Sequence, residues 1–135
     1  MNFRILGWVS LALLVIAASP FWLKTINKFT FKTKAPAFLK LLKSLRAIHK
    51  IAGGALAVIA IIHGYMALSG QIRLHTGLIT YIAIGLTALL GLKHHFAKKK
   101  DIRIFKAHRL TALISAALFL VHLIRPWLLF ELFGV

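Results

Sequence analysis

Four histidines form two equally spaced pairs in this chain of 135 residues. His49 and His63 enclose thirteen mostly aliphatic residues in HKIAGGALAVIAIIH, and His108 and His122 enclose thirteen in HRLTALISAALFLVH. Fourteen steps along a helix return a side chain to within about 40° of its starting direction and move it about 21 Å along the axis. Each pair therefore shares one helix face, at two levels. Because neutral imidazole is a common metal ligand, this spacing indicates ligand chemistry at two depths.

The segments that carry these histidines are apolar enough to cross a membrane. The chain is 60% hydrophobic, and four blocks free of charged residues approach the length that a helix needs to span roughly 30 Å of hydrocarbon. These blocks are Ile5 to Leu23, Ile51 to Leu68, Thr76 to Leu92 and Leu110 to Ile124. We predict an all-α integral membrane protein, a single four-transmembrane-helix bundle over residues 1–135, with helices at about 5–23, 47–69, 75–92 and 106–126. The first block resembles a signal peptide, but Pro20 directly after the possible cleavage region favours a retained helix.

The basic residues predict the orientation of this bundle. Eighteen Lys and Arg stand against two acidic residues, Asp101 and Glu131, and fifteen of the eighteen fall in two loops. Lys and Arg collect on the cytoplasmic side of a membrane, so we expect both loops in the cytoplasm and both termini outside (N-out/C-out). We expect the chain to be a multi-pass protein of the plasma membrane. Charges that flank spans favour contact with anionic membrane lipids, and we expect no nucleic-acid partner. The two loops carry Lys24, Lys28, Lys32, Lys34, Lys40, Lys43, Arg46 and Lys50, and then Lys93, Lys98, Lys99, Lys100, Arg103, Lys106 and Arg109.

One segment of the first loop allows two interpretations. From Pro36 to Lys50, apolar residues recur at helical spacing with Lys and Arg between them. This pattern is typical of a helix on the membrane surface, and equally of a cytoplasmic extension of the second transmembrane helix. We favour the membrane-surface stretch.

The two histidine pairs align with each other across the second and fourth blocks. His49 and His63 precede His108 and His122 by 59 residues each, and the two helices run parallel because one crossing separates them. His49 is therefore level with His108 near the cytoplasm, and His63 is level with His122 near the outside. Two imidazoles from facing helices suit the axial positions of heme iron, so we expect two heme b groups. The chain has no cysteine, which excludes iron–sulfur clusters and covalently attached heme.

Basic residues near the ends of these helices complete the predicted sites. Those that could reach heme propionates are Lys50, Arg109, Arg73 and Arg125. His75, at the outer mouth of the third block, could serve a substrate, a quinone or a proton, although an interfacial histidine without a role is favoured. His94 and His95 are expected on the inner solvated face.

Two other interpretations of the histidines remain open at this point. A transmembrane histidine is often a hydrogen-bonded packing residue, and histidine also binds zinc, copper and nickel. Neither acidic residue lies within an apolar block, so the spans lack the carboxylates that a metal-transport site usually has. A non-redox membrane module, for metal-ion transport or for anchoring a partner through the basic loops, is the alternative to a redox protein.

The segment from Arg46 to Arg125 resembles the ferric-reductase-like transmembrane domain of ferric reductases, NADPH oxidases and the heme subunit of bacterial methionine sulfoxide reductase systems. The resemblance rests on the paired histidines of HKIAGGALAVIAIIH and HRLTALISAALFLVH, with one helix between them. It implies that His49 and His108 ligate the inner heme, and that His63 and His122 ligate the outer heme. The chain departs from that family by having fewer predicted helices than many members and by lacking a flavin or nicotinamide domain.

The sequence thus predicts transmembrane electron transfer by a bis-histidine diheme cytochrome b. The electron donor would be a separate flavoprotein or a quinol, on the cytoplasmic side or in the membrane, and the acceptor would lie on the outer face. Whether the chain is itself an oxidoreductase, such as a ferric-reductase-like subunit, is left open, and so is its oligomeric state.

Overall fold

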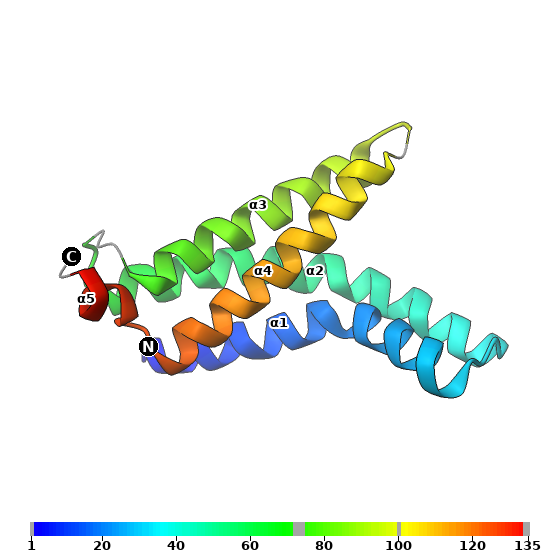
Figure 1. Cartoon of the computed structure of the whole chain (residues 1–135), viewed down its shortest axis with the longest axis horizontal. Helices are drawn as coiled ribbons and strands as arrows, with labels where there is room; N and C mark the ends of the chain where they lie inside the picture. The colour runs from blue at the N-terminus through cyan, green and yellow to red at the C-terminus, as the bar shows by residue number, and fades with distance from the viewer. Residues whose placement is uncertain (1, 72–74, 100, 134–135) are drawn as a thin grey trace. The chain divides into compact units, whose positions relative to one another are not determined.

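Every regular element of the described chain is a helix. The computed structural model describes residues 2–71, 75–99 and 101–133, and no strand occurs among them (Figure 1). The elements are α1 (Phe3–Ile26), the π-helical turn η1 (Asn27–Phe31), α2 (Pro36–Ala67), α3 (Thr76–Phe96), α4 (Ile102–Ile124) and α5 (Leu128–Phe133). The combined helix α1–η1, α2, α3 and α4 are each long and apolar enough to cross a membrane. The prediction of an all-α, multi-pass membrane protein with four spans is confirmed.

The second span begins much earlier than the sequence pattern indicated. α2 runs without interruption through all 32 residues from Pro36 to Ala67, so the favoured membrane-surface stretch is wrong, and the segment extends the span. Pro36 fits the first helical position, because its fixed φ suits a helix start and its missing N–H is not needed there. No glycine or further proline follows before Gly53. At 1.5 Å per residue α2 is about 48 Å long, which exceeds the roughly 30 Å of the hydrocarbon layer.

Polar side chains cap the helices that carry or face the histidines. The Asp101 carboxylate accepts the N–H of Arg103 at 2.7 Å at the start of α4. His75 precedes α3, and its Nδ1 accepts the N–H of Leu78 at 2.9 Å. Each acceptor satisfies one of the N–H groups that a helix start leaves without an intrahelical partner. The Asp101 cap explains why α4 begins at residue 102 and not at the predicted residue 106.

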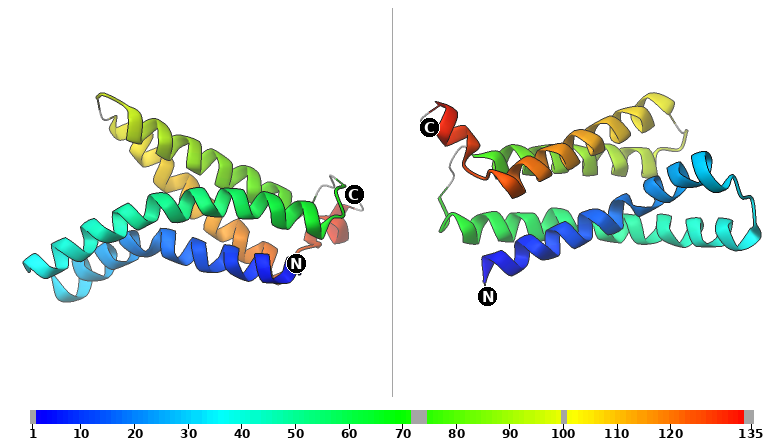
Figure 2. Two further views of the ribbon diagram at one scale, coloured as in Figure 1. Left: turned by 180° about the vertical axis from the view of Figure 1, so that it is seen from behind. Right: turned by 60° about the horizontal axis from the view of Figure 1, so that its bottom comes forward.

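The chain forms two compact units, Met1–Ile59 and Ala60–Val135. In the first unit, α1 and the first part of α2 run antiparallel (Figure 2). The turn between them is held by Asn27, whose side chain donates to the carbonyl of Thr33 and accepts the N–H of Thr33, both at 3.0 Å. Lys32 in this turn has a φ of 49°, the left-handed conformation that commonly ends a helix.

The second unit is built around a hairpin of α3 and α4. The two helices lie side by side and antiparallel in all views (Figures 1 and 2). Thr80 and Ile84 of α3 and Ser115 and Phe119 of α4 are buried, and the hydroxyl oxygens of Thr87 and Ser115 lie 3.1 Å apart. Small and hydroxyl-bearing residues let membrane helices approach closely, so Thr80, Thr87 and Ser115 explain the tight hairpin.

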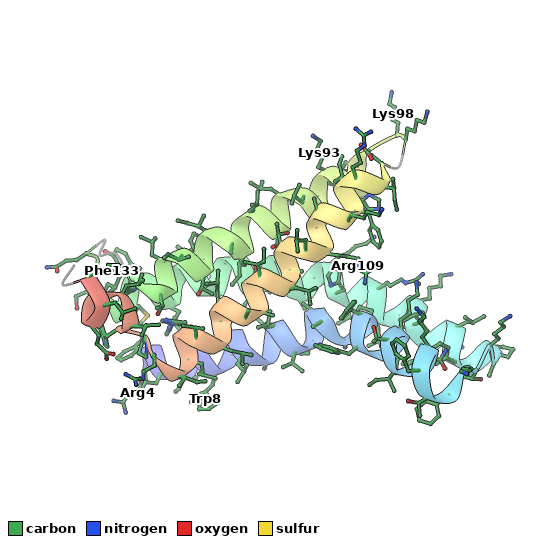
Figure 3. All side chains as sticks on the ribbon, viewed as in Figure 1. Arg4, Trp8, Lys93, Lys98, Arg109 and Phe133 are labelled. Carbon is green, nitrogen blue, oxygen red and sulfur yellow. The ribbon has the colours of Figure 1, made fainter. Side chains whose placement is uncertain are left out.

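The two ends of the hairpin differ in charge. Lys93 and Lys98 lie at the turn between α3 and α4, and Phe133 of α5 lies at the opposite end (Figure 3). The charged side chains described at that opposite end are Arg125 and Glu131, which form an ion pair at 2.9 Å. Among the described residues, one end of the unit is therefore strongly basic, whereas the other is close to neutral.

Large apolar side chains remain exposed along all four spans. Examples are Val15, Ile51, Ile82 and Leu120, one from each span. Water-soluble monomers rarely expose contiguous apolar surface of this extent, whereas lipid tails cover it without cost. The exposure pattern is thus the one expected of helices that face a bilayer.

Candidate functional site

His122 lies two residues before the end of α4, and its ring is held by α3. Its Nδ1 lies 3.0 Å from Oγ1 of Thr76, the first residue of α3, and the same hydroxyl lies 2.7 Å from the carbonyl oxygen of Pro126. A hydroxyl has one proton to donate, and a carbonyl only accepts. The Thr76 hydroxyl therefore donates to Pro126 and accepts Nδ1–H of His122. The lone pair of neutral His122 is consequently on Nε2.

The same tautomer follows for two more of the predicted ligands. Nδ1 of His108, on α4, lies 2.9 Å from the carbonyl oxygen of Thr87 on α3. In the first unit, Nδ1 of His49, on α2, lies 2.6 Å from the carbonyl oxygen of Ala17 on α1. Each Nδ1 carries the proton, because a carbonyl oxygen can only accept. Histidines that bind metals commonly donate their other ring N–H to such an acceptor, which fixes both the tautomer and the ring orientation.

His63 and His122 come together in the second unit. Their ring centroids lie 6.5 Å apart, with an angle of 72° between the ring planes. Two imidazoles that bind one metal ion from opposite sides, through nitrogens about 2 Å from it, have ring centres roughly 6 Å apart. The observed separation therefore fits a bis-imidazole ligand set. Of the two predicted pairs, this is the one that lies within a single unit.

The other pair is divided between the units. His49 belongs to the first unit and His108 to the second, and the pairing of these two residues stays a prediction. What the structure gives for each of them is its local setting, a half-buried ring with Nδ1–H bonded to the carbonyl of a neighbouring helix.

His75 has a role that the sequence analysis missed. An interfacial histidine without a role was favoured, but His75 is buried, with 9% of its surface exposed, and it caps α3. Its Nδ1 accepts a hydrogen bond from Leu78, so the proton of neutral His75 is on Nε2. The His75 ring lies 6.0 Å from the ring of His122 and 6.0 Å from that of Trp127. His75 therefore belongs to the surroundings of the His63–His122 pair.

Two glycines of α3 lie against the imidazoles of α4. A Cβ atom built on Gly91 would lie 3.0 Å from Cε1 of His108. A Cβ atom built on Gly77 would lie 2.8 Å from Cε1 of His122 and 2.9 Å from Cε1 of His75. Real Cβ atoms essentially never approach as closely as at Gly77, and the distance at Gly91 is tighter than nine in ten real contacts. The absence of a side chain at these two positions therefore lets the rings approach the backbone of α3.

The basic residues predicted to reach heme propionates have different surroundings. Lys50 and Arg109 are exposed, each directly after a predicted histidine ligand, and the guanidinium of Arg109 lies 5.9 Å from the ring of Phe105. Arg125 ends α4 and is paired with Glu131, a partner that the sequence analysis did not anticipate. Arg73 lies outside the described residues.

The two histidines at the other end of α3 differ from each other. His95 is exposed, as expected for a solvated face, whereas His94 is half-buried. The His94 ring lies 5.4 Å from the ring of Phe105. His94 also lines an open depression of about 270 Å³, together with Asp101, Ile102 and Phe105.

The residues that hold the rings of α4 were not found from the sequence. They are Thr76, Gly77, Thr87 and Gly91, all on α3, a helix that contributes none of the four predicted ligands. A signal was present in the sequence, since Gly77 and Gly91 are separated by fourteen residues, the same interval as His108 and His122.

No known protein family, curated protein or solved structure matches this chain. Among the described residues, no group of three or more His, Cys, Asp or Glu side chains is arranged to hold a metal ion. His63 and His122 are the predicted pair that the structure brings together, with ring centroids 6.5 Å apart.

Proposed function

We propose that this protein transfers electrons across a membrane as a bis-histidine diheme cytochrome b. The observation that carries the proposal is the His63–His122 pair, with ring centroids 6.5 Å apart and with the lone pair of His122 directed to Nε2 by the Thr76 hydroxyl. Intramembrane imidazoles are costly to retain, and their presence favours a functional role.

The outer heme would be held by His63 and His122, and the inner heme by His49 and His108. Support for the inner ligands comes from the Nδ1–H bonds of His49 to Ala17 and of His108 to Thr87. A bound heme supplies one-electron exchange at its iron. The four histidines would ligate it, and Thr76, Thr87 and Ala17 would orient the imidazoles through their bonds to Nδ1–H. Lys50, Arg109, Arg73 and Arg125 are proposed to bind the propionates.

The proposed orientation places the basic turn between α3 and α4 in the cytoplasm and both termini outside. It is supported by the contrast between the Lys93 and Lys98 end of the hairpin and the nearly neutral α5 end, because Lys and Arg resist translocation. The membrane is proposed to be the plasma membrane. An interior-negative potential favours outward movement of an electron by about 2.3 kcal/mol per 100 mV when the full field is crossed.

The donor and acceptor are proposed to be separate molecules. The donor would be a flavoprotein or a quinol, and the acceptor would lie at the outer face, next to the His63–His122 pair. The described residues form four long apolar helices, the turns between them and the short helix α5.

The test is the heme content of purified protein and of one ligand variant. We expect two b-type hemes per chain, with low-spin spectra, in the unaltered protein. His63→Ala should leave one heme per chain, because the inner ligands are unaffected. His95→Ala is the matched control, since His95 is an exposed histidine and not a predicted ligand, and it should keep both hemes. A colourless protein that retains zinc or nickel would overturn the proposal in favour of a metal-ion module.

A further inference from the structure

The glycines of α3 and the histidines of α4 share one register. Gly77 and Gly91 are fourteen residues apart, as are His108 and His122. Because α3 and α4 are antiparallel, Gly77 faces His122 and Gly91 faces His108, as the short distances from their built Cβ atoms show. Gly85 lies between them on the same helix, and a Cβ atom there would have no neighbour within 4 Å. The contacts therefore occur at the two ligand levels and not along the whole helix.

Beside each of these glycines, the imidazole of α4 forms a hydrogen bond with α3. A helical side chain leans toward the N-terminus and covers the turn before its own position. The missing side chain of Gly91 therefore leaves the carbonyl of Thr87, one turn earlier, open to Nδ1–H of His108 at 2.9 Å. Next to Gly77, the hydroxyl of Thr76 accepts Nδ1–H of His122 at 3.0 Å.

We propose that α3, which contributes no ligand, is the positioning helix for both imidazoles of α4. Gly91 with the Thr87 carbonyl sets the ring of His108, and Gly77 with the Thr76 hydroxyl sets the ring of His122. The orientations of the His108 ring and of the His122 ring are set independently, by different residues of one helix. The contacts exist within the hairpin itself, whereas their effect on heme rests on the proposed function.

The two acceptors differ in a way that would affect the reduction potential of a heme held by these histidines. Donation of Nδ1–H makes an imidazole a stronger electron donor through Nε2, and a stronger axial donor favours the oxidised iron and so lowers the reduction potential. The acceptor of His108 is a backbone carbonyl, which no side-chain substitution removes. The acceptor of His122 is the Thr76 hydroxyl, which is removable without changing the ligand.

The first experiment compares Thr76→Val with Thr76→Ser by redox titration of each heme. Thr76→Val keeps the branched shape but removes the acceptor of His122, so the outer heme should shift to a higher midpoint potential while the inner heme stays unchanged. Thr76→Ser restores the hydroxyl and should restore the potential. A purely structural role of Thr76 would not give a one-heme shift that serine reverses. Unchanged potentials in Thr76→Val, or an equal shift of both hemes, would overturn the inference.

The second experiment compares glycine substitutions on one helix. Gly91→Ala should displace the ring of His108 and weaken retention of the inner heme by about tenfold to a hundredfold, the usual effect of disturbing the partner of a metal-bound histidine. Gly77→Ala should do the same for the outer heme. Gly85→Ala is the matched control and should retain both hemes. Equal behaviour of Gly91→Ala and Gly85→Ala would contradict the proposal.

A measurement without heme separates this inference from the proposed function. In ¹⁵N-histidine-labelled protein, nitrogen chemical shifts report which ring nitrogen carries the proton. The Nδ1–H tautomer is expected for His108 and His122, with His122 alone shifting toward a mixture in Thr76→Val. If the unaltered protein binds no heme but shows this result, the proposed function fails and the positioning role of α3 stands. If His122 keeps its tautomer in Thr76→Val, the positioning role fails.

Discussion

Which ring nitrogen carries the proton distinguishes His75 from its neighbour His122. In His122, Nδ1 donates to Thr76, whereas in His75, Nδ1 accepts from the backbone of Leu78. The protonated Nε2 of neutral His75 has no lone pair for a metal. His75 is therefore suited to capping α3 beside the His63–His122 pair, 6.0 Å from the ring of His122, but not to replacing a member of that pair.

Substitution of His75 should therefore affect stability and not ligation. His75→Ala removes a helix N-cap, which typically costs about 1 kcal/mol, and should lower the thermal midpoint in detergent while both hemes are retained. His75→Asn keeps a capping acceptor and should retain most of the stability. Circular dichroism melting and heme stoichiometry measure the two effects. Loss of one heme in both variants would instead make His75 a ligand.

At the scale of elements, the closeness of α3 and α4 depends on small residues at their interface. Ser115 is 3% exposed, and its hydroxyl lies 3.1 Å from that of Thr87. The carbonyl of the same Thr87 accepts the bond from His108. The packing of the helices and the placement of the His108 ring are therefore linked through one residue.

A bulky residue at this contact should loosen the hairpin. Ser115→Leu inserts volume into a packed interface, which usually costs about 1–3 kcal/mol, and should lower the thermal midpoint. Ala117→Leu places the same side chain at an exposed position of the same helix and should leave the midpoint nearly unchanged. Equal midpoints for the two variants would show that the Thr87–Ser115 contact does not hold the helices together.

The spans were predictable from the sequence because uncharged apolar blocks of this length typically form transmembrane helices. The start of α2 was not, since basic residues among periodic apolar ones suit a surface helix as well as an extended span. For the site, the paired histidines were visible as a repeat. Their supports were not, because the acceptor of His108 is the backbone carbonyl of Thr87 and carries no residue-type signature. The interval between Gly77 and Gly91 could be matched to that between His108 and His122 only once the antiparallel register of α3 and α4 was known.

At the scale of the whole molecule, the charge pattern should decide which ends of the spans face the cytoplasm. The chain contains no cysteine, so a single introduced cysteine is a clean probe. Gln71, after α2, and Lys98, after α3, are both exposed and lie at opposite ends of α3.

The proposed orientation predicts opposite labelling of these two positions in intact cells. Gln71→Cys should react with a membrane-impermeant thiol reagent added outside, whereas Lys98→Cys should react only after permeabilisation. The unaltered chain provides the background. The reverse pattern would invert the proposed orientation of the spans and, with it, the assignment of the His63–His122 pair to the outer face.

The bonding of the α4 imidazoles to α3 also bears on how a new chain is made. His108 and His122 satisfy their ring N–H groups on the adjacent span, and a short turn joins the two helices. A hairpin that enters the bilayer as a unit thus has these two ring N–H groups already hydrogen-bonded, and they are not exposed unpaired to acyl chains. On the proposed function, we therefore expect a stable apoprotein in the bilayer that precedes heme binding.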